Sequence, residues 1–209
     1  MNSNQTVWIA RHGNRLDFVN PEWFNTAELP YDPPLSEDGI MQAQQLGERL
    51  KSENIAHIFA SPFLRTIQTA HQIAEILNLE IKLEAGLSEW HNPEWMSEHP
   101  AIHPLDYLDK EYSRINWHYS SKYTPQYPET ETEVMQRTGK IVKQLIAEFP
   151  EDILLVGHGV SVLGTTWGLV AGTPEIRAAL CCLVKVVYKD DCWQLKLNGD
   201  TSHLNQTES

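Results

Sequence analysis

Short apolar segments alternate with segments of helical periodicity along most of the chain, and this alternation restricts the fold more than any other feature. The apolar segments are 6–10 (TVWIA), 57–60, 80–83 and 153–156, and the helical periodicity covers 37–51, 64–77, 132–149 and 160–170. Strands that alternate with helices build a mostly parallel sheet with helices on both faces. The end of the chain, 182–188 and 192–197, is typical of a hairpin. The sequence predicts an α/β fold, a three-layer αβα sandwich whose mostly parallel central sheet has an antiparallel edge strand.

Length and composition restrict the class of protein. The 209 residues suit a single domain, and the formal net charge of -12 with no basic stretch argues against a nucleic-acid partner. We find neither a secretory signal nor an apolar run of about 20 residues, so we expect no membrane partner. The cysteines, Cys181, Cys182 and Cys192, form no CxxC motif and are expected to be reduced thiols. We therefore expect a cytoplasmic location.

We expect residues 1–209 to form this single domain, with three further features. A stretch at about 90–128 is dense in His, Trp, Tyr and Pro, and we interpret it as a cap inserted into the domain. The polar tail from about residue 199 is expected to be flexible. The exposed edge of the hairpin at 182–197 leads to the hypothesis that two chains pair there as a homodimer.

Residues that could take part in binding or catalysis follow the predicted strands. In such sheets, ligands bind outside the carboxyl ends of the strands. The residues at these ends are Arg11, His12, Arg65, Glu89 and His158, with Arg15 close behind His12. Taken singly, Arg65 could be a solvated helix residue and Glu89 a surface carboxylate. A histidine between two glycines after an apolar strand, as at His158, is more typical of a functional residue than of a purely structural turn.

Together these residue types suit phosphoryl transfer. Arginines present planar donor forks that match phosphate oxygens and stabilise charge on a transferring phosphoryl group. One histidine, kept neutral, can act as nucleophile while the second donates to a phosphoryl oxygen. A carboxylic acid can protonate the leaving group and then activate water. This scheme requires neither a metal nor another cofactor.

Three segments resemble the signatures of the histidine phosphatase superfamily, which includes the cofactor-dependent phosphoglycerate mutases. They are Ala10-Arg11-His12-Gly13, the stretch 61–70 (SPFLRTIQTA) and 156–159 (VGHG). The resemblance covers about 7–170 and implies a phosphoglycerate mutase-like fold. By this resemblance His12 is the phosphorylated nucleophile, Glu89 is the proton donor, and Arg11, Arg65 and His158 line the phosphate pocket.

Finer motifs are similar to the Sts-type tyrosine phosphatases and the ecdysteroid-phosphate phosphatases. They are 11–15 (RHGNR) followed by Asp17, 31–36 (YDPPLS) and 86–90 (GLSEW). In that branch the second arginine, here Arg15, makes an extra phosphate contact, whereas the mutases usually have RHGES or RHGQS. We therefore expect a phosphatase acting on a small-molecule or peptide phosphomonoester. The alternatives are a mutase-type isomerase and a catalytically inactive phosphate-binding module. A nucleotide-binding protein is set aside because no GxGxxG or Walker-type loop follows the first strand.

The insertion is predicted to set substrate choice. Its aromatic side chains suit an apolar or aromatic leaving group, or else form a small core of the cap itself. We expect the substrate rim to include Asn14, Trp90 and His91. The i, i+4 spacing of two histidines, His99 and His103, would fit a metal site on a helix, but the prolines that follow each of them argue against one. We therefore predict no metal.

Overall fold

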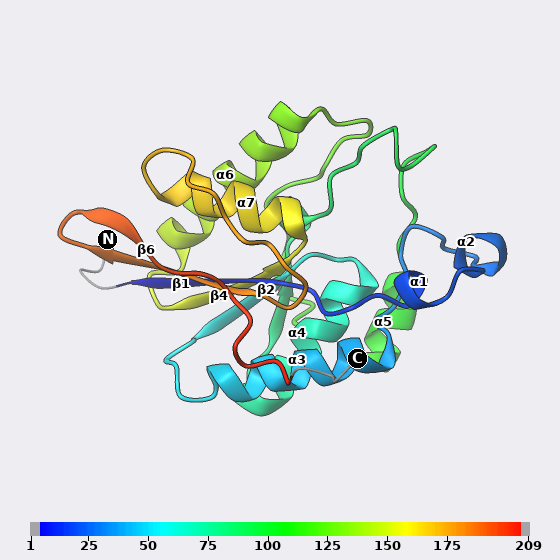
Figure 1. Ribbon diagram of the computed structural model, residues 1–209, viewed down its shortest axis with the longest axis horizontal. Coiled ribbons are helices and arrows are strands. Elements are labelled where there is room, and N and C mark those ends of the chain that lie inside the picture. Colours follow the sequence, from blue (N-terminus) through cyan, green and yellow to red (C-terminus); the bar gives the residue numbers. More distant parts are fainter. Residues whose placement is uncertain (1–4, 206–209) are drawn as a thin grey trace.

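The computed structural model describes residues 5–205. A six-stranded sheet in the order β3-β2-β4-β1-β5-β6 forms its centre (Figure 1). Strands β1 to β4 are mutually parallel, and β5 pairs antiparallel with β1 and with β6. The strands are β1 (Thr6–Arg11), β2 (His57–Ala60), β3 (Ile81–Leu83), β4 (Ile153–Gly157), β5 (Leu183–Lys189) and β6 (Cys192–Asp200). The predicted parallel sheet with an antiparallel edge is confirmed.

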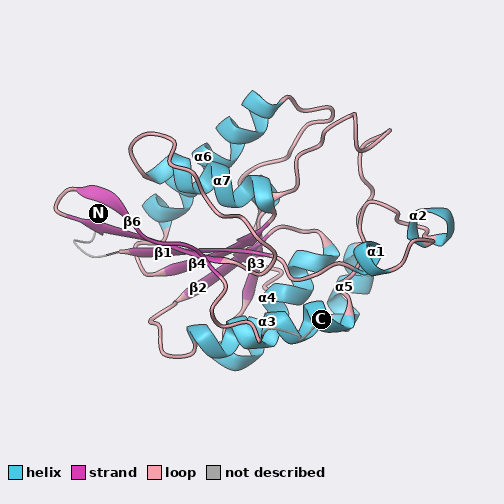
Figure 2. Cartoon of the chain, viewed as in Figure 1, coloured by secondary structure: helices cyan, strands magenta, loops and turns pink. Residues whose placement is uncertain are grey.

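Helices cover both faces of the sheet, as predicted for a three-layer sandwich. One face carries α3 (Glu37–Leu50) and α4 (Leu64–Leu77), and the other carries α6 (Glu131–Glu148) and α7 (Gly159–Leu169), as Figures 1 and 2 show. In β1, Val7 and Ile9 pack under α6 and α7, while Trp8 and Ala10 pack toward α3 and α4. Because the strand is buried on both faces, its sequence is apolar without alternation.

The helices begin at caps that the sequence specifies. Ser36, the N-cap of α3, accepts a hydrogen bond from the Gly39 amide through its hydroxyl. Helix α6 begins with a capping box, in which the Thr130 hydroxyl and the Glu133 carboxylate satisfy each other's backbone amides. These local signals explain why the predicted helix boundaries lie within one or two residues of the observed ones.

Three short helices were not predicted. They are α1 (Leu16–Val19), α2 (Trp23–Thr26) and, inside the insertion, α5 (Leu105–Glu111). Their sequences give no periodic signal because α1 and α2 bury none of their residues and α5 buries only Leu108. Tertiary contacts define α5 instead, since Leu108 packs with Ile67 of α4 in a small core beside the sheet.

The described part of the segment that we expected to be a flexible tail, residues 199–205, contacts the domain. Strand β6 continues to Asp200, the His203 ring bonds the Cys181 carbonyl, and Leu204 packs on the core under α3 and α4. These contacts keep the chain on the domain to residue 205, and the rest of the predicted tail lies outside the described residues. Within residues 5–205, no helix has the length and apolar character needed to cross a lipid bilayer.

Candidate active site

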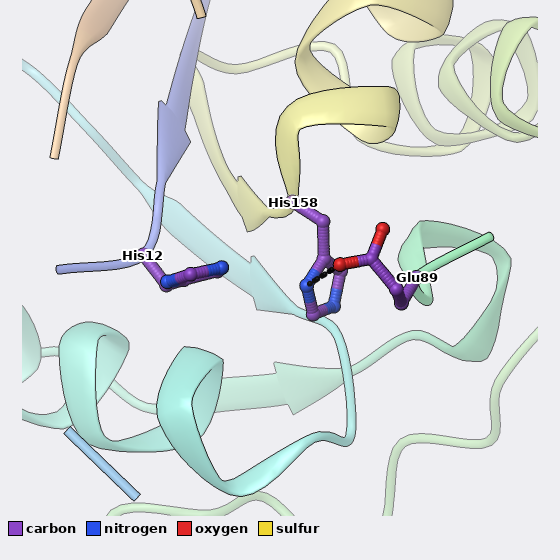
Figure 3. Close-up of side chains that lie close together, drawn as sticks. All are labelled: His12, Glu89 and His158. Carbon is purple, nitrogen blue, oxygen red and sulfur yellow. Dashed lines mark ion pairs between the residues drawn. The ribbon is translucent and has the colours of Figure 1, made fainter. Parts of the chain in front are cut away.

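Strand register brings the predicted site residues to one edge of the sheet. Arg11 pairs with Gly157 across β1 and β4, and Ala60 pairs with Val156 across β2 and β4. The residues that follow these three strands therefore emerge side by side. Figure 3 shows the result: the His12 ring points toward His158, and Glu89 approaches His158 from the other side. The rings of the two histidines are edge to face, with centroids 5.4 Å apart.

His12 is fully buried and its orientation is fixed. Its backbone amide donates to Gly157 O at 3.0 Å, and its ring Nδ1 lies 2.8 Å from Gly13 O. A carbonyl can only accept, so Nδ1 carries the proton and Nε2 keeps its lone pair. Nε2 is buried and has no hydrogen-bond partner among the described residues. Burial, with Arg65 and His158 nearby, holds the pKa of His12 well below its usual range, so the ring is neutral at pH 7.

His158 connects the centre of the site to Glu89. Its Nε2 lies 2.9 Å from the Ser61 hydroxyl, and its Nδ1 lies 3.3 Å from Glu89 Oε2. Burial lowers the pKa of His158 to about 4, because desolvation and the nearby Arg65 cation outweigh the Glu89 carboxylate. Burial opposes ionisation of Glu89, but His158 and Arg65 outweigh it and hold its pKa well below the usual range. The free site therefore contains a carboxylate beside a neutral imidazole.

Arg65 is a fixed cation within this group. It is 1% exposed, and its Nη2 lies 3.4 Å from Glu89 Oε2 and 3.3 Å from His158 Nδ1. Burial lowers its pKa to about 10, so it stays charged at pH 7. Behind it lies the buried Asp32 carboxylate, 3.9 Å from Arg65 Nη1, which also accepts the Leu64 amide at the start of α4. Asp32 therefore compensates the arginine charge that the site requires.

Two further arginines border the site. Arg11, at the end of β1, donates from Nη1 to Ala178 O at 2.8 Å and lies beside the start of α7. Arg15 is held by the Asp17 carboxylate, with Nε 2.8 Å from Oδ1, and its guanidinium stacks over the Phe18 ring at 4.4 Å. Arg65 thus contacts His158, Arg11 lies beside the start of the helix that follows His158, and Arg15 lines the same cavity as Arg65, so the site can hold a dianionic phosphoryl group.

A cavity of about 200 Å³ opens beside these residues. It is lined by Arg15, Arg65 and Glu89 at its base and by Phe24, Pro30, Tyr31, Trp95 and Met96 around its wall. Phe24 and Trp95 are 57% and 59% exposed, which is unusual for large apolar side chains. Because α2 and the insertion supply these rings, segments distant in the sequence form a single apolar rim.

The rim predicted from the sequence differs from this lining. The Asn14 amide donates to Asp38 Oδ2 at 2.9 Å, so it fixes the loop to α3. Trp90 donates from its indole to Glu129 O and supports Trp95 from behind, with ring centroids 5.1 Å apart. His91 is buried and lines a neighbouring cavity of about 120 Å³. Asn14, Trp90 and His91 are therefore close in sequence to residues that line the cavity, but they do not line it themselves.

Two histidines and a carboxylate are also a donor set for zinc. One ring nitrogen from each of His12 and His158 and one Glu89 oxygen lie within 4.8 Å of one another. The Arg65 guanidinium, however, lies within hydrogen-bond range of two of these donors. A fixed positive charge at that position opposes a cation and attracts an anion, so the residues present fit a phosphoryl group better than a metal ion.

Comparison with known proteins decides the family. The model of the histidine phosphatase superfamily, branch 1, matches residues 7–201. The chain belongs to this superfamily. The predicted resemblance is therefore confirmed, and the match covers nearly the whole of the described structure, from the first strand to the end of the last.

Relatives of this chain differ in their stated roles. The transcription factor tau 55 kDa subunit of Saccharomyces cerevisiae is 30% identical over 247 residues, spanning 97% of this chain and 57% of that protein. The ecdysteroid-phosphate phosphatase of Drosophila melanogaster is 25% identical over 92% of this chain and 32% of its own length. A probable phosphoglycerate mutase, GpmB of Proteus mirabilis, is 28% identical over 95% of this chain and 94% of its own length. The chain therefore spans less than two thirds of the first two relatives.

A solved structure shares the fold. The crystal structure of the ecdysone phosphate phosphatase from Bombix mori, in complex with tungstate, superimposes with a TM-score of 0.82 at 19% identity. The match covers 98% of this chain and 96% of that chain. The phosphoglycerate mutase-like α/β architecture is therefore shared along the whole described domain, including the insertion.

Several residues of the site were not assigned a role from the sequence. Ser61 orients His158, Asp32 compensates Arg65, and Asp17 holds Arg15. All three lie inside the motifs quoted above, and Ser61 directly follows a predicted strand, a position that could have identified it. His103 bonds the Asp32 carboxylate at 2.9 Å, whereas His99 packs edge to face against His91, so these two histidines have separate partners.

Proposed function

We propose that this histidine phosphatase hydrolyses a phosphomonoester through a phosphohistidine intermediate on His12, without a metal ion. The observation that carries the proposal is the His12 ring itself. Its Nδ1–H is held by Gly13 O, its Nε2 has no partner among the described residues, and the ring points toward His158 (Figure 3). A neutral imidazole with an orientated lone pair is the form that attacks phosphorus.

The first step transfers the phosphoryl group to His12. The Nε2 lone pair forms a bond to phosphorus while the bond from phosphorus to the ester oxygen breaks. The leaving oxygen keeps the electron pair and takes a proton from the Glu89 carboxyl group. The arginines and the His158 ring hydrogen-bond the phosphoryl oxygens, and this stabilises the charge that develops on them.

The charge of the bound substrate favours protonation of Glu89, and the proton comes from the solvent. In the free site Glu89 is ionised, because Arg65 and the neighbouring rings keep its pKa low. A bound phosphoryl dianion adds negative charge beside the carboxylate and neutralises Arg65. Both effects raise the pKa of Glu89 and favour its protonated form before the leaving group departs. The acid is therefore formed when substrate binds.

The second step returns the site to its starting state. Glu89, now a carboxylate, takes a proton from a water molecule whose oxygen attacks the phosphorus of phosphohistidine. The bond from phosphorus to His12 Nε2 breaks, its electron pair returns to the ring, and inorganic phosphate leaves. Arg65 and His158 keep the same contacts in both steps, since the phosphoryl group stays in one place while its partners change.

The rim supports a leaving group with an apolar or aromatic body. Phe24, Trp95 and Met96 would contact the part of the substrate beyond the phosphate, and such rings contribute most when they bury apolar surface. Phenyl, naphthyl and sterol phosphates are therefore expected to have higher kcat/KM than glycerol phosphate. Equal rates across such a panel would contradict this choice of leaving group.

The alternative activity is a mutase-type isomerisation. It is favoured by the relative GpmB, described as a probable phosphoglycerate mutase, which the chain matches along 94% of its length. A phosphoglycerate has a carboxylate outside the phosphate site, and a cation would be needed to hold it. The rim beyond Arg15 is apolar instead, which favours hydrolysis. Conversion of 3-phosphoglycerate to its isomer in the presence of the bisphosphate would support the alternative.

The deciding experiment compares wild type, His12→Ala and His118→Ala in p-nitrophenyl phosphate hydrolysis with a chelator present. His118 is exposed and lies outside the site, so its variant controls for loss of one histidine. Turnover in wild type and His118→Ala that is lost at least about 1,000-fold in His12→Ala is expected. Mass spectrometry after rapid alkaline quench should detect one phosphoryl group on wild type. Full turnover in His12→Ala would show that the nucleophile is another residue.

A cytoplasmic location and a homodimer are two further proposals, and each rests on its own observation. Cys181 and Cys182 are buried and unpaired, which supports a reducing compartment such as the cytoplasm. Strand β6 is an edge strand of the sheet, so pairing of two chains along it stays a prediction. Cell fractionation tests the first proposal and sedimentation tests the second. A small-molecule or peptide phosphomonoester remains the expected partner of the site.

A further inference from the structure

A buried arginine of α6 donates hydrogen bonds to backbone carbonyls of the loop that carries Glu89. Arg137 is 2% exposed, and its guanidinium uses all its donors. Nη1 donates to Gly86 O at 3.0 Å and Ser88 O at 3.1 Å, and Nη2 donates to Glu89 O at 3.1 Å. Nε and Nη2 each donate to the Glu129 carboxylate at 2.7 Å. One side chain thus connects the helix, the Glu89 loop and the end of the insertion.

Glu129 completes the connection from the other side. Its carboxylate accepts the His91 amide at 3.3 Å, and its backbone amide donates to His91 O at 3.0 Å. The Trp90 indole donates to Glu129 O at 2.8 Å. The two ends of the insertion are therefore joined directly beside Glu89, and the joint is held by a buried ion pair.

The energetics of this pair argue for a role beyond stability. Burying two charges costs desolvation energy that their attraction often only offsets, and an apolar pair of the same volume is frequently as stable. Moreover, three of the five hydrogen bonds go to loop carbonyls and none goes to α6. Such an arrangement gives the loop one defined conformation, which a flexible apolar contact would not.

Glu89 needs this support because its own side-chain contacts are long. Its carboxylate lies 3.4 Å from Arg65 Nη2, 3.3 Å from His158 Nδ1 and 3.1 Å from the Trp90 amide. Its position relative to His12 is therefore set mainly by its backbone. Proton transfer requires hydrogen-bond distance to the leaving oxygen, so a small displacement of the loop would weaken it.

We propose that Arg137, with Glu129, is a positioning residue that places the Glu89 carboxyl group for proton transfer. The inference rests on the phosphatase function proposed above, because it assigns the role of the pair through Glu89. Its distinctive consequence concerns the leaving group. Phenolate, whose conjugate acid has a pKa of about 10 like tyrosine, needs the proton, whereas the weakly basic p-nitrophenolate does not.

The test measures the first turnover, in which His12 becomes phosphorylated, with phenyl phosphate and with p-nitrophenyl phosphate. In Arg137→Lys the charge beside Glu129 is kept, but the fork that reaches three carbonyls is lost. We expect release of phenol to slow about 100-fold and release of p-nitrophenol less than about 5-fold. Leu145→Ala, at a fully buried position of the same helix, is the control and should affect both substrates equally.

A double variant separates positioning from general damage. Glu89→Gln removes the acid, so adding Arg137→Lys to it should slow phenol release no further. Losses that multiply in the double variant, or equal losses on both substrates, would overturn the proposal. Should Arg137→Lys not fold, Glu129→Gln keeps the volume while weakening the pair, and the same leaving-group dependence is expected from it.

Failure of the proposed function can be told apart from failure of this inference. Wild type that releases neither phenol nor p-nitrophenol would refute the phosphatase function alone. Amide hydrogen exchange of residues 86–91 then decides the positioning role without any substrate. Exchange that is faster in Arg137→Lys than in Leu145→Ala supports it, and equal exchange in the two variants contradicts it.

Discussion

The buried ring of His158 should make the stability of the folded chain depend on pH in a defined window. The pKa of His158 is lowered to about 4 in the folded protein, while an unfolded chain has a histidine pKa of about 6.5. Below pH 6.5 the His158 ring takes up a proton in the unfolded chain, whereas in the folded chain it does so only near pH 4. Stability from this group is therefore fully present above pH 6.5 and falls as the pH decreases toward 4.

The magnitude follows from the width of that window. Each pH unit contributes about 1.4 kcal/mol, so His158 alone lowers the free energy of unfolding by about 3 kcal/mol between pH 6.5 and pH 4. That is a large fraction of the stability of a typical domain. Glu89 acts in a lower window, because its pKa lies well below the usual range and its contribution is lost only as pH falls through that value.

The assay is urea unfolding of wild type and His158→Gln at several values between about pH 7 and pH 4.5. Buffers should contain no phosphate or sulfate, because these anions would bind the folded site and add stability. The variant loses contacts with Ser61 and Glu89 and should be less stable at pH 7. Its deficit relative to wild type should shrink by about 2.5 kcal/mol as the pH falls to about 4.5.

His118→Gln, at an exposed position, is the matched control for loss of one histidine. Because only the difference between two curves is used, buried or half-buried histidines without contact to His158 cancel, such as His91 and His203. Parallel curves for wild type and His158→Gln would refute the reasoning, since they would mean that the His158 ring ionises equally in the folded and unfolded chain.

Three further predictions concern the walls of the site. Gly39→Ala would place a methyl group against the Asn14 carbonyl and displace the loop that carries Arg15, so we expect a loss of about 1–3 kcal/mol in stability and about 100-fold in kcat/KM. The exposed Gln44→Ala is its control, and unchanged kinetics of Gly39→Ala would contradict the packing described. Asp17→Asn should weaken inhibition by inorganic phosphate about 10-fold, because Arg15 loses its charged partner; an unchanged inhibition constant would mean that Arg15 does not contact phosphate. Dialysis against a chelator should leave p-nitrophenyl phosphate hydrolysis unchanged, and activity that is lost and then restored by zinc would show that His12, Glu89 and His158 hold a metal after all.

The sequence by itself determined the layers of the fold and the centre of the site. Apolar runs such as 153–156 and amphipathic runs such as 64–77 are local signals, and their alternation leaves few topologies. In a parallel sheet the carboxyl ends of the strands meet at one edge. Residues that follow these strands, such as His12 and His158, could therefore be placed together before any coordinates were known.

Only the tertiary structure decided what surrounds that centre. The rim includes Phe24 and Trp95, which come from α2 and the insertion, while the predicted Trp90 and His91 bond backbone carbonyls and do not line the cavity. The partners of the buried polar groups are equally distant: Ser61 bonds a ring 97 positions away, and Arg137 bonds a carbonyl 48 positions away. Periodicity and composition indicate which face of an element is buried. Hydrogen bonds between residues far apart in the sequence depend instead on how irregular loops cross the edge of the sheet. The packing of those loops therefore decides which apolar rings face the cavity and which carboxylates compensate its arginines.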